Sequence, residues 1–215
     1  TKDMGFDREN LLVATLPYEA VYGGWTFESD YTKRDALLNR LEQNPQIKEI
    51  ALGRGNITHS RMQWTRPVEN GESVIFGVYV VSWNFLKTMG IDIVDGRDFL
   101  PSDEHSATGA LIFNEQASKE LSITVGEQIN GHLDNANTPI VGICKDFCFQ
   151  SAHYGITPYA FLVYGKYGWD QPRIAYIRTV AGADIAEVRK FITDTVLDIS
   201  PNSDPEKVEV KFFDN

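Results

Sequence analysis

The sequence predicts an α+β fold with two lobes. Strand-like and helix-like segments interleave along the chain without the strict alternation of a parallel α/β fold. Each end of the chain contains a β-α-β pattern with one longer helix, and two such units can pair into a split β-α-β lobe. The middle holds several strands and two short helices. We expect residues 1–70 plus 172–215 to form the first lobe and residues 71–171 to form an inserted small α/β lobe, with approximate boundaries.

The first β-α-β unit follows the chain in the order strand, loop, helix and strand, over residues 10–17, 18–31, 33–44 and 47–52. Thr32 is the expected N-cap of the helix because its hydroxyl can accept a backbone N–H bond. Pro45 ends the helix, since the residue before proline avoids helical backbone angles. The predicted buried stripe consists of Leu37, Leu38 and Leu41.

The inserted segment contains a predicted hairpin and a predicted central strand. Asn70-Gly71 is typical of a hairpin turn, and the run Val74–Val81 is apolar enough to be buried on both faces. Ser82 and Asn114 are expected to cap short helices, and Gly90 is expected to end the first of them. The expected strands span 62–68, 73–81, 91–94, 110–113, 139–144 and 159–164, and the helices 83–89 and 115–121.

The C-terminal unit has the clearest pattern in the chain. Residues 173–179 alternate as a strand does, and apolar residues recur at helical spacing over 185–199. Asp184 lies where the helix dipole favours a negative charge. Pro201 follows the helix, and Val208, Val210 and Phe212 predict a final strand.

Composition and charge exclude several classes of function. The chain has 215 residues, with 20 basic and 30 acidic side chains and a formal net charge of −10. Such a balance argues against nucleic acid and against an anionic membrane surface as direct partners. The apolar runs are shorter than the ~20 residues needed to cross a bilayer. The abrupt ends lead us to expect a soluble segment of a longer protein.

Motifs for catalysis or cofactor binding do not emerge. Gly53-Arg54-Gly55 lacks the remaining residues of a dinucleotide or phosphate loop and is better explained as a turn. Cys144 and Cys148 would lie roughly 13 Å apart in a strand, too far for a disulfide. Together with His153 they lack a fourth metal ligand. We therefore expect reduced cysteines, no metal, no cofactor and no enzymatic activity.

An ordered series of segments resembles one family. The segments are Met4–Leu12, Met89–Phe99, Ala110–Ala117, Val125–Ile129, Ile140–Phe147 and Pro158–Phe161. In this order they resemble the extracytoplasmic core domain of MacB/FtsX-like ABC transporter permeases, in the form common in Bacteroidetes-type bacteria. The resemblance covers nearly the whole chain. Cys148 and the Tyr18–Tyr31 loop depart from the family pattern.

The resemblance implies a non-catalytic periplasmic domain that lies between the first two transmembrane helices of an inner-membrane permease. The family fold has a porter-like lobe built from the chain ends and an inserted lobe. A separate subunit or domain, the cognate ABC ATPase, hydrolyses ATP. The external domain is thought to transmit motion and to engage a substrate or an envelope partner, and a second permease copy could form a dimer.

Polar loops of the inserted lobe are the expected contact surface, because they should be exposed and distal to the membrane. Hinges are expected at Pro67–Gly71 and Gly168–Pro172. Two alternatives remain open: a ligand-sensing domain that binds a peptide or lipid between the lobes, and an envelope hydrolase. The contact loops are 103–109 and 134–138, with candidate residues Asp103, Glu104, His105, Asp134, Asn135 and Asn137.

Overall fold

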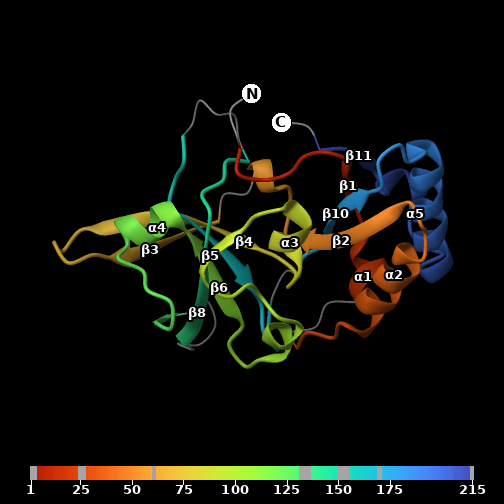
Figure 1. The fold of residues 1–215 in the computed structure, drawn as a ribbon. Coiled ribbons are helices and arrows are strands. Elements are labelled where there is room, and N and C mark those ends of the chain that lie inside the picture. Colours follow the sequence, from red (N-terminus) through yellow and green to blue (C-terminus); the bar gives the residue numbers. More distant parts are fainter. Residues whose placement is uncertain are drawn as a thin grey trace.

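The chain forms two β-sheets, one built from its ends and one from its middle (Figure 1). The computed structural model describes residues 4–23, 28–59, 62–130, 137–149, 155–168 and 171–213. The first sheet is antiparallel, with the order β11-β1-β10-β2. Its strands are β1 (Leu11–Thr15), β2 (Ile47–Gly53), β10 (Ile174–Thr179) and β11 (Val210–Phe212). The α+β fold and the shared sheet of the first and last strands are thus confirmed.

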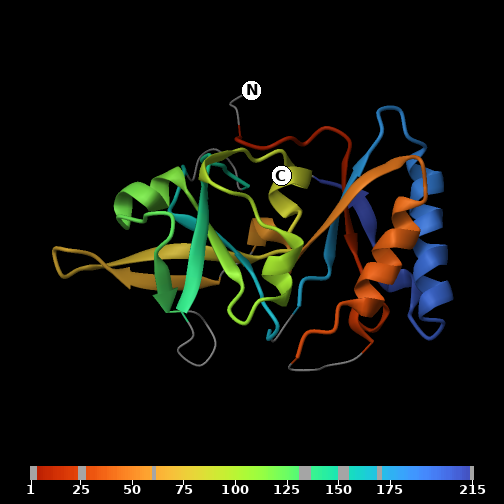
Figure 2. The same ribbon diagram turned by 60° about the horizontal axis from the view of Figure 1, so that its bottom comes forward.

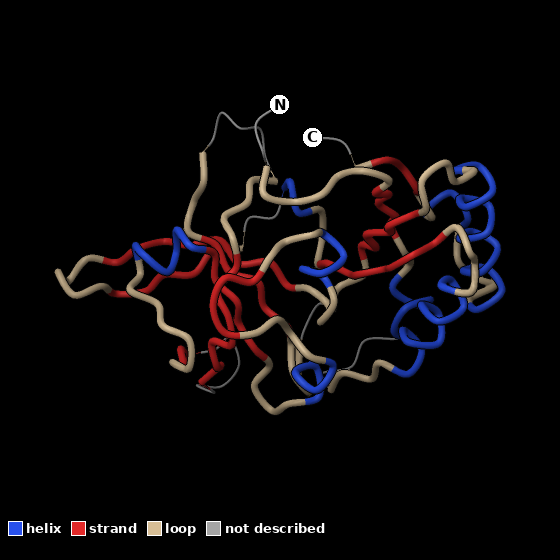
Figure 3. The backbone as a smooth tube through the Cα atoms, in the orientation of Figure 1, coloured by secondary structure: helices blue, strands red, loops and turns tan. Residues whose placement is uncertain are grey.

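Three helices cover one face of this four-stranded sheet: α1 (Tyr18–Tyr22), α2 (Thr32–Glu42) and α5 (Ile185–Ile199) (Figure 2). Figure 3 shows most of the helical residues gathered on this outer side. The core there consists of alternate strand residues and the apolar stripes of the helices. Asp184 caps α5, and its carboxylate accepts the Glu187 N–H at 3.1 Å.

Two local predictions in this region are wrong. Thr32 is the first residue of α2 rather than its cap, because Asp30 already accepts the Thr32 N–H at 3.0 Å. The segment predicted as one loop from Tyr18 to Tyr31 begins with α1, which ends at Gly23 with a φ of 78°.

The second sheet has seven strands in the order β3-β4-β9-β6-β8-β5, with β7 paired to β8. The β4–β9 and β6–β8 pairs are parallel and the others antiparallel. Strand β4 lies inside the sheet, as its apolar run predicts. The strands are β3 (Gln63–Pro67), β4 (Ser73–Val80), β5 (Ile93–Gly96), β6 (Ala110–Asn114), β7 (Gln128–Asn130), β8 (Asn137–Cys144) and β9 (Tyr159–Val163).

Strand pairing moves the first lobe boundary. Because β3 pairs with β4, the boundary expected between residues 70 and 71 falls inside a hairpin turn, where Gly71 has a φ of 82°. The chain instead passes between the sheets in the β2–β3 connection. Pro67–Gly71 therefore forms a projecting hairpin tip (Figure 1) and lies outside the connection between the sheets. Residues 169 and 170 of the other hinge candidate lie outside the described residues.

The short helices of the inserted lobe are α3 (Phe85–Met89) and α4 (Glu115–Glu120). Asn114 caps α4 by accepting the Ala117 N–H at 3.0 Å, and Gly90 ends α3 with a left-handed φ of 70°, both as predicted. Ser82 does not cap α3, because its hydroxyl accepts the Leu52 N–H at 2.8 Å and donates to Asn84.

An aromatic core joins the two sheets. Helix α3 lies between them, and Phe85 packs against Tyr176 of the first sheet and Phe161 of the second, at ring separations of 5.3 and 5.5 Å. Near the two chain ends, Phe6 and Phe213 contact each other at 5.6 Å. A third core lies under α4, on the far face of the inserted sheet. The two lobes therefore form one continuously packed body.

Candidate functional site

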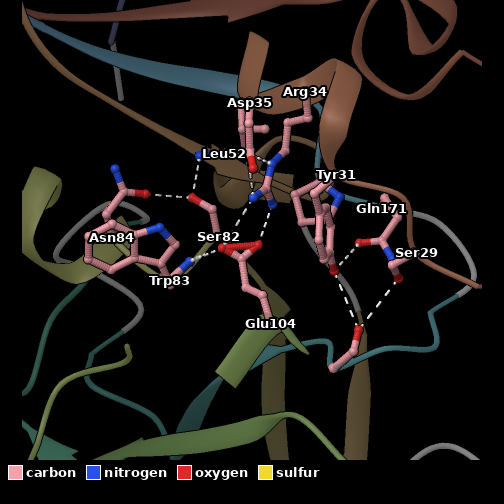
Figure 4. Close-up of polar contacts among 12 residues, drawn as sticks. Ser29, Tyr31, Arg34, Asp35, Leu52, Ser82, Trp83, Asn84, Glu104 and Gln171 are labelled. Atoms are coloured by element: carbon pink, nitrogen blue, oxygen red, sulfur yellow. Dashed lines mark hydrogen bonds and ion pairs between the residues drawn. The ribbon is translucent and has the colours of Figure 1, made fainter. Parts of the chain in front are cut away.

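The contact between the lobes centres on a buried ion pair. Arg34 lies on α2 of the first lobe, and Glu104 lies on a 3₁₀ helix, η2 (Pro101–His105), of the second. The guanidinium donates to both carboxylate oxygens, Nη1 to Oε2 and Nη2 to Oε1 at 3.4 Å (Figure 4). Only 7% of the Arg34 side chain and 3% of the Glu104 side chain are exposed. We refer to this pair as the Arg34–Glu104 junction.

Neighbouring groups complete the junction. The Tyr31 ring lies 4.0 Å from the Arg34 guanidinium carbon, and Asp35 accepts a further bond from Arg34 at 2.9 Å. The Trp83 backbone N–H donates to Glu104 Oε1 at 3.5 Å. Burial, the largest single influence, would lower the pKa of Arg34, but the attraction and hydrogen bonds of Glu104 together with Tyr22 and Asp35 raise it above its ordinary value. The Arg34 guanidinium therefore stays charged inside the protein.

A polar network extends the junction toward the β9–β10 connection. Tyr31 OH donates either to the Gly165 carbonyl or to Gln171 Oε1, each at 3.4 Å, and Gln171 donates to Ser29 (Figure 4). These bonds hold the segment before α2 against the inserted lobe.

Two tyrosines bridge the sheets in the aromatic core. The hydroxyls of Tyr79 on β4 and Tyr176 on β10 lie 2.8 Å apart. Tyr79 donates to the Gly55 carbonyl at 2.8 Å, and Tyr176 accepts the Ile57 N–H at 3.2 Å, so Tyr176 can donate to Tyr79. A Cβ on Gly53 would meet the Tyr79 hydroxyl at 2.0 Å, which explains this glycine. Gly55 has the positive φ, 72°, that the predicted turn requires.

The buried tyrosines predict a loss of stability at alkaline pH. Burial raises the pKa of Tyr31 and of Tyr176 to about 12, above the ordinary value near 10. Because the folded value is the higher one, their contribution is complete below about pH 10 and is lost as the pH rises through about 12. Urea unfolding at several pH values should show this fall, with a shallower slope for Tyr176→Phe. The exposed Tyr167→Phe variant is the control, and constant stability above pH 10 would contradict the prediction.

The predicted contact residues separate into buried and exposed ones. Asp103 and Glu104 are buried, so their expected exposure is wrong. Asp103 accepts two bonds from Arg97, at 2.8 and 2.9 Å. His105 is exposed and touches the Tyr31 ring, and Asn137 is exposed at the start of β8. Asp134 and Asn135 lie outside the described residues.

Sequence reasoning missed Arg34. A signal was present, because residue 34 precedes Leu37 by three positions and Leu41 by seven, on the same buried face of α2. An arginine on an apolar stripe requires a buried acidic partner. The chain has 30 acidic residues, and nothing local to α2 identifies Glu104 among them.

The cysteines and acidic residues do not form a metal centre in the part of the chain that is described. There, no three His, Cys, Asp or Glu side chains are placed to share a metal ion. Both cysteines are described, and neither forms a disulfide. Burial raises the pKa of Cys144, whereas Cys148 is half-buried. His153 lies outside the described residues.

Comparisons with known proteins give a consistent picture. Residues 3–195 match the family model described as the MacB-like periplasmic core domain. The fold is similar to that of the periplasmic region of MacB from Actinobacillus actinomycetemcomitans, with 10% identity, a TM-score of 0.60, and 96% of this chain and 90% of that chain covered. It is also similar to the extracellular domain of the noncanonic ABC-type transporter YknZ from Gram-positive bacteria, with 14% identity, a TM-score of 0.63, and 94% and 100% covered. Curated protein sequences gave no match. Among the described helices, none has the length and apolar character to cross a membrane.

Proposed function

Because this chain belongs to the family of MacB-like periplasmic core domains of ABC transporter permeases, we propose that it transmits motion from the membrane part of its permease to a partner outside the membrane. The chain is a periplasmic or extracellular, non-catalytic permease domain. Motion and partner contact are the proposed part. The cognate ATPase would act on the domain through the full-length permease.

The observation that carries the proposal is the way the lobes are joined. The first and last described strands belong to one lobe, where β1 pairs with β11, and Phe6 near the N-terminus contacts Phe213. The Arg34–Glu104 junction and the aromatic core tie this lobe to the inserted one. Since packed interiors deform little, a displacement applied at the ends would carry the inserted lobe with it.

We propose that the partner binds at the side of the molecule opposite the chain ends. Figure 1 places the segment after η2 and the start of β8 at the lower edge, away from the ends at the top. His105 and Asn137 are exposed there and remain candidate contact residues. A substrate, an envelope component or a second permease copy could occupy this side. The Bacteroidetes form of the family also stays a proposal.

The seam between the lobes does not favour the ligand-sensing alternative. Its hollow has a volume of about 260 Å³, and Arg34, Asp35, Glu42 and Glu104 line it. This alternative, a peptide or lipid bound between the lobes, would be favoured by a deep apolar pocket with a few polar groups, and a lining with four charged residues is not of that kind. We therefore retain the transmission role as the main proposal.

The test is carried out in the full-length permease with its ATPase. Glu104→Gln should reduce export strongly while ATP hydrolysis persists. The substitution removes the charge pair of the junction, so motion of the first lobe would no longer be passed to the inserted lobe. Export and ATP hydrolysis are measured per folded permease in the membrane. His105→Glu with Asn137→Glu forms a second arm, in which export falls and the stability of the domain is unchanged.

Ile192→Ala is the matched control. Ile192 is fully buried on the inner face of α5, away from the junction, and its truncation costs about 2–5 kcal/mol. If this variant lowers export as much as Glu104→Gln at equal stability, the loss reflects stability alone and the transmission proposal fails. Full export by Glu104→Gln would also reject it.

A further inference from the structure

We propose that a groove on the inserted lobe binds one uncharged alkyl chain of a membrane amphiphile. The groove has a volume of about 450 Å³, within the ~300–1,000 Å³ of typical small-ligand sites. Its walls come from the β2–β3 connection, β4, the segment after β8 and the segment that enters β9. The residues that matter below are Met62, Ile75, Gly77, Cys148, Phe149 and Tyr159.

The described lining carries no charge in a strongly charged protein. The chain has 20 basic and 30 acidic residues, yet every residue that lines the groove in the described part of the chain is uncharged. Met62, Phe149 and Tyr159 are among the bulky residues of the lining. A charged headgroup would find no counter-ion among the described lining residues and would lose its hydration, so the matching ligand part is an alkyl chain.

Exposed apolar side chains flank the same groove. Among the described residues, Ile75 and Ile156 are the most exposed large hydrophobic side chains, at 55% and 50%. Ile75 lines the groove, and Ile156 lies between the lining residues Gly155 and Thr157. Apolar surface that clusters at a concave site marks a binding surface.

The groove is shaped by close packing of β4 and β9. Gly77 pairs with Tyr159, and a Cβ on Gly77 would come within 2.4 Å of the Tyr159 ring. The absence of a side chain at Gly77 therefore lets the Tyr159 ring approach the neighbouring strand closely. This arrangement gives the groove an aromatic wall against which a methylene chain can pack.

The position of the groove points to a membrane lipid as the source of the alkyl chain. The Cys148 N–H donates to the Met4 carbonyl at 2.9 Å, and the Phe149 ring lies 4.5 Å from that of Phe6. The groove is thus beside the N-terminal segment, and the segment after β8, which forms one of its walls, lies on the side of both chain ends in Figure 1. This step rests on the proposed function, in which that side faces the membrane.

The test uses the 215-residue chain and the thiol of Cys148 as a reporter. N-ethylmaleimide should modify the half-buried Cys148 and not the buried Cys144, as mass spectrometry can show. Monomeric n-decyl-β-maltoside should slow this modification in proportion to its occupancy, and neutral phosphatidylcholine vesicles should do the same. Maltose, the headgroup alone, should have no effect. A trileucine peptide with an acetylated N-terminus and an amidated C-terminus, and so without charge, represents peptides as the competing class of ligand.

Ile75→Glu should weaken decyl maltoside binding about tenfold or more, because it puts an uncompensated charge at the groove. Val94→Glu is the matched control: Val94 is 46% exposed and does not line the groove, so protection of Cys148 should remain. Thermal unfolding verifies that both variants are folded.

Lack of protection by decyl maltoside, or equal protection in Ile75→Glu, would overturn the inference. Protection by the peptide and not by the alkyl ligand would reject the alkyl assignment. Protection by decyl maltoside without protection by vesicles would reject the membrane source. Because no transport is measured, a negative result here is distinguishable from failure of the transmission proposal, which depends on export by Glu104→Gln.

Discussion

Glu104→Ala is expected to lower the free energy of unfolding by about 3–5 kcal/mol. Removal of the carboxylate leaves the Arg34 guanidinium buried with its main counter-charge gone, since only 7% of its side chain is exposed. Asp35 compensates little, because its own side chain is 53% exposed and solvated. Guanidinium chloride unfolding, followed by circular dichroism, measures the change.

Two further variants test whether the unpaired charge of Arg34 causes that loss of stability. Arg34→Met combined with Glu104→Leu should return stability to within about 1 kcal/mol of the parent, because apolar replacement removes both charges together. Lys190→Ala breaks an exposed pair with Asp194 and should change stability by about 0.5 kcal/mol or less. If Glu104→Ala has as small an effect as Lys190→Ala, the junction does not stabilise the contact between lobes.

Phe85→Ala should be equally damaging, with a loss of about 3–5 kcal/mol. Phe85 is fully buried in α3, and its ring lies 5.6 Å from Tyr79, 5.3 Å from Tyr176 and 5.5 Å from Phe161. Truncation leaves a cavity at the place where the two sheets meet. Chemical denaturation gives the loss, and near-ultraviolet circular dichroism should show weaker aromatic order.

The control for Phe85 is a phenylalanine outside the core. Phe212 on β11 is 49% exposed, so Phe212→Ala should cost about 1 kcal/mol or less. Phe85→Leu should fall between the two, because it keeps part of the buried volume. Similar losses for Phe85→Ala and Phe212→Ala would mean that the aromatic core contributes little to the union of the lobes.

Sequence patterns predicted the helices, strands and caps that are determined by residues close together in the sequence. Helix α5 shows helical spacing over its whole length and carries its own cap, Asp184. Strand β4 is apolar because both faces of the inserted sheet are covered over its second half, Phe76–Val80, whereas Ile75 near its start is 55% exposed. The Asn114 cap and the Gly90 stop depend on neighbouring backbone groups only, so the residue type suffices to place them.

Elements that depend on distant residues could not be predicted in this way. Arg34 and Glu104 are separated by 70 positions, and only the packing of α2 against η2 makes them partners. In the sequence, Asp103 and Glu104 look like part of a solvated loop. The fold places Arg97 beside Asp103 and Arg34 beside Glu104, so both carboxylates are paired. Strand β7 has three residues and no alternation of its own, since its pairing with β8 defines it.

The position of β1 between β10 and β11 has a consequence for the order in which the protein can fold. Leu12 pairs with Ile177 on one side and with Phe212 on the other, so the first strand has no neighbour until the last part of the chain has been synthesised. All strands of the inserted sheet lie between Gln63 and Val163 and can pair earlier. Closing the long loop to β11 carries the larger entropy cost. The inserted lobe can therefore serve as the template on which the terminal strands assemble last.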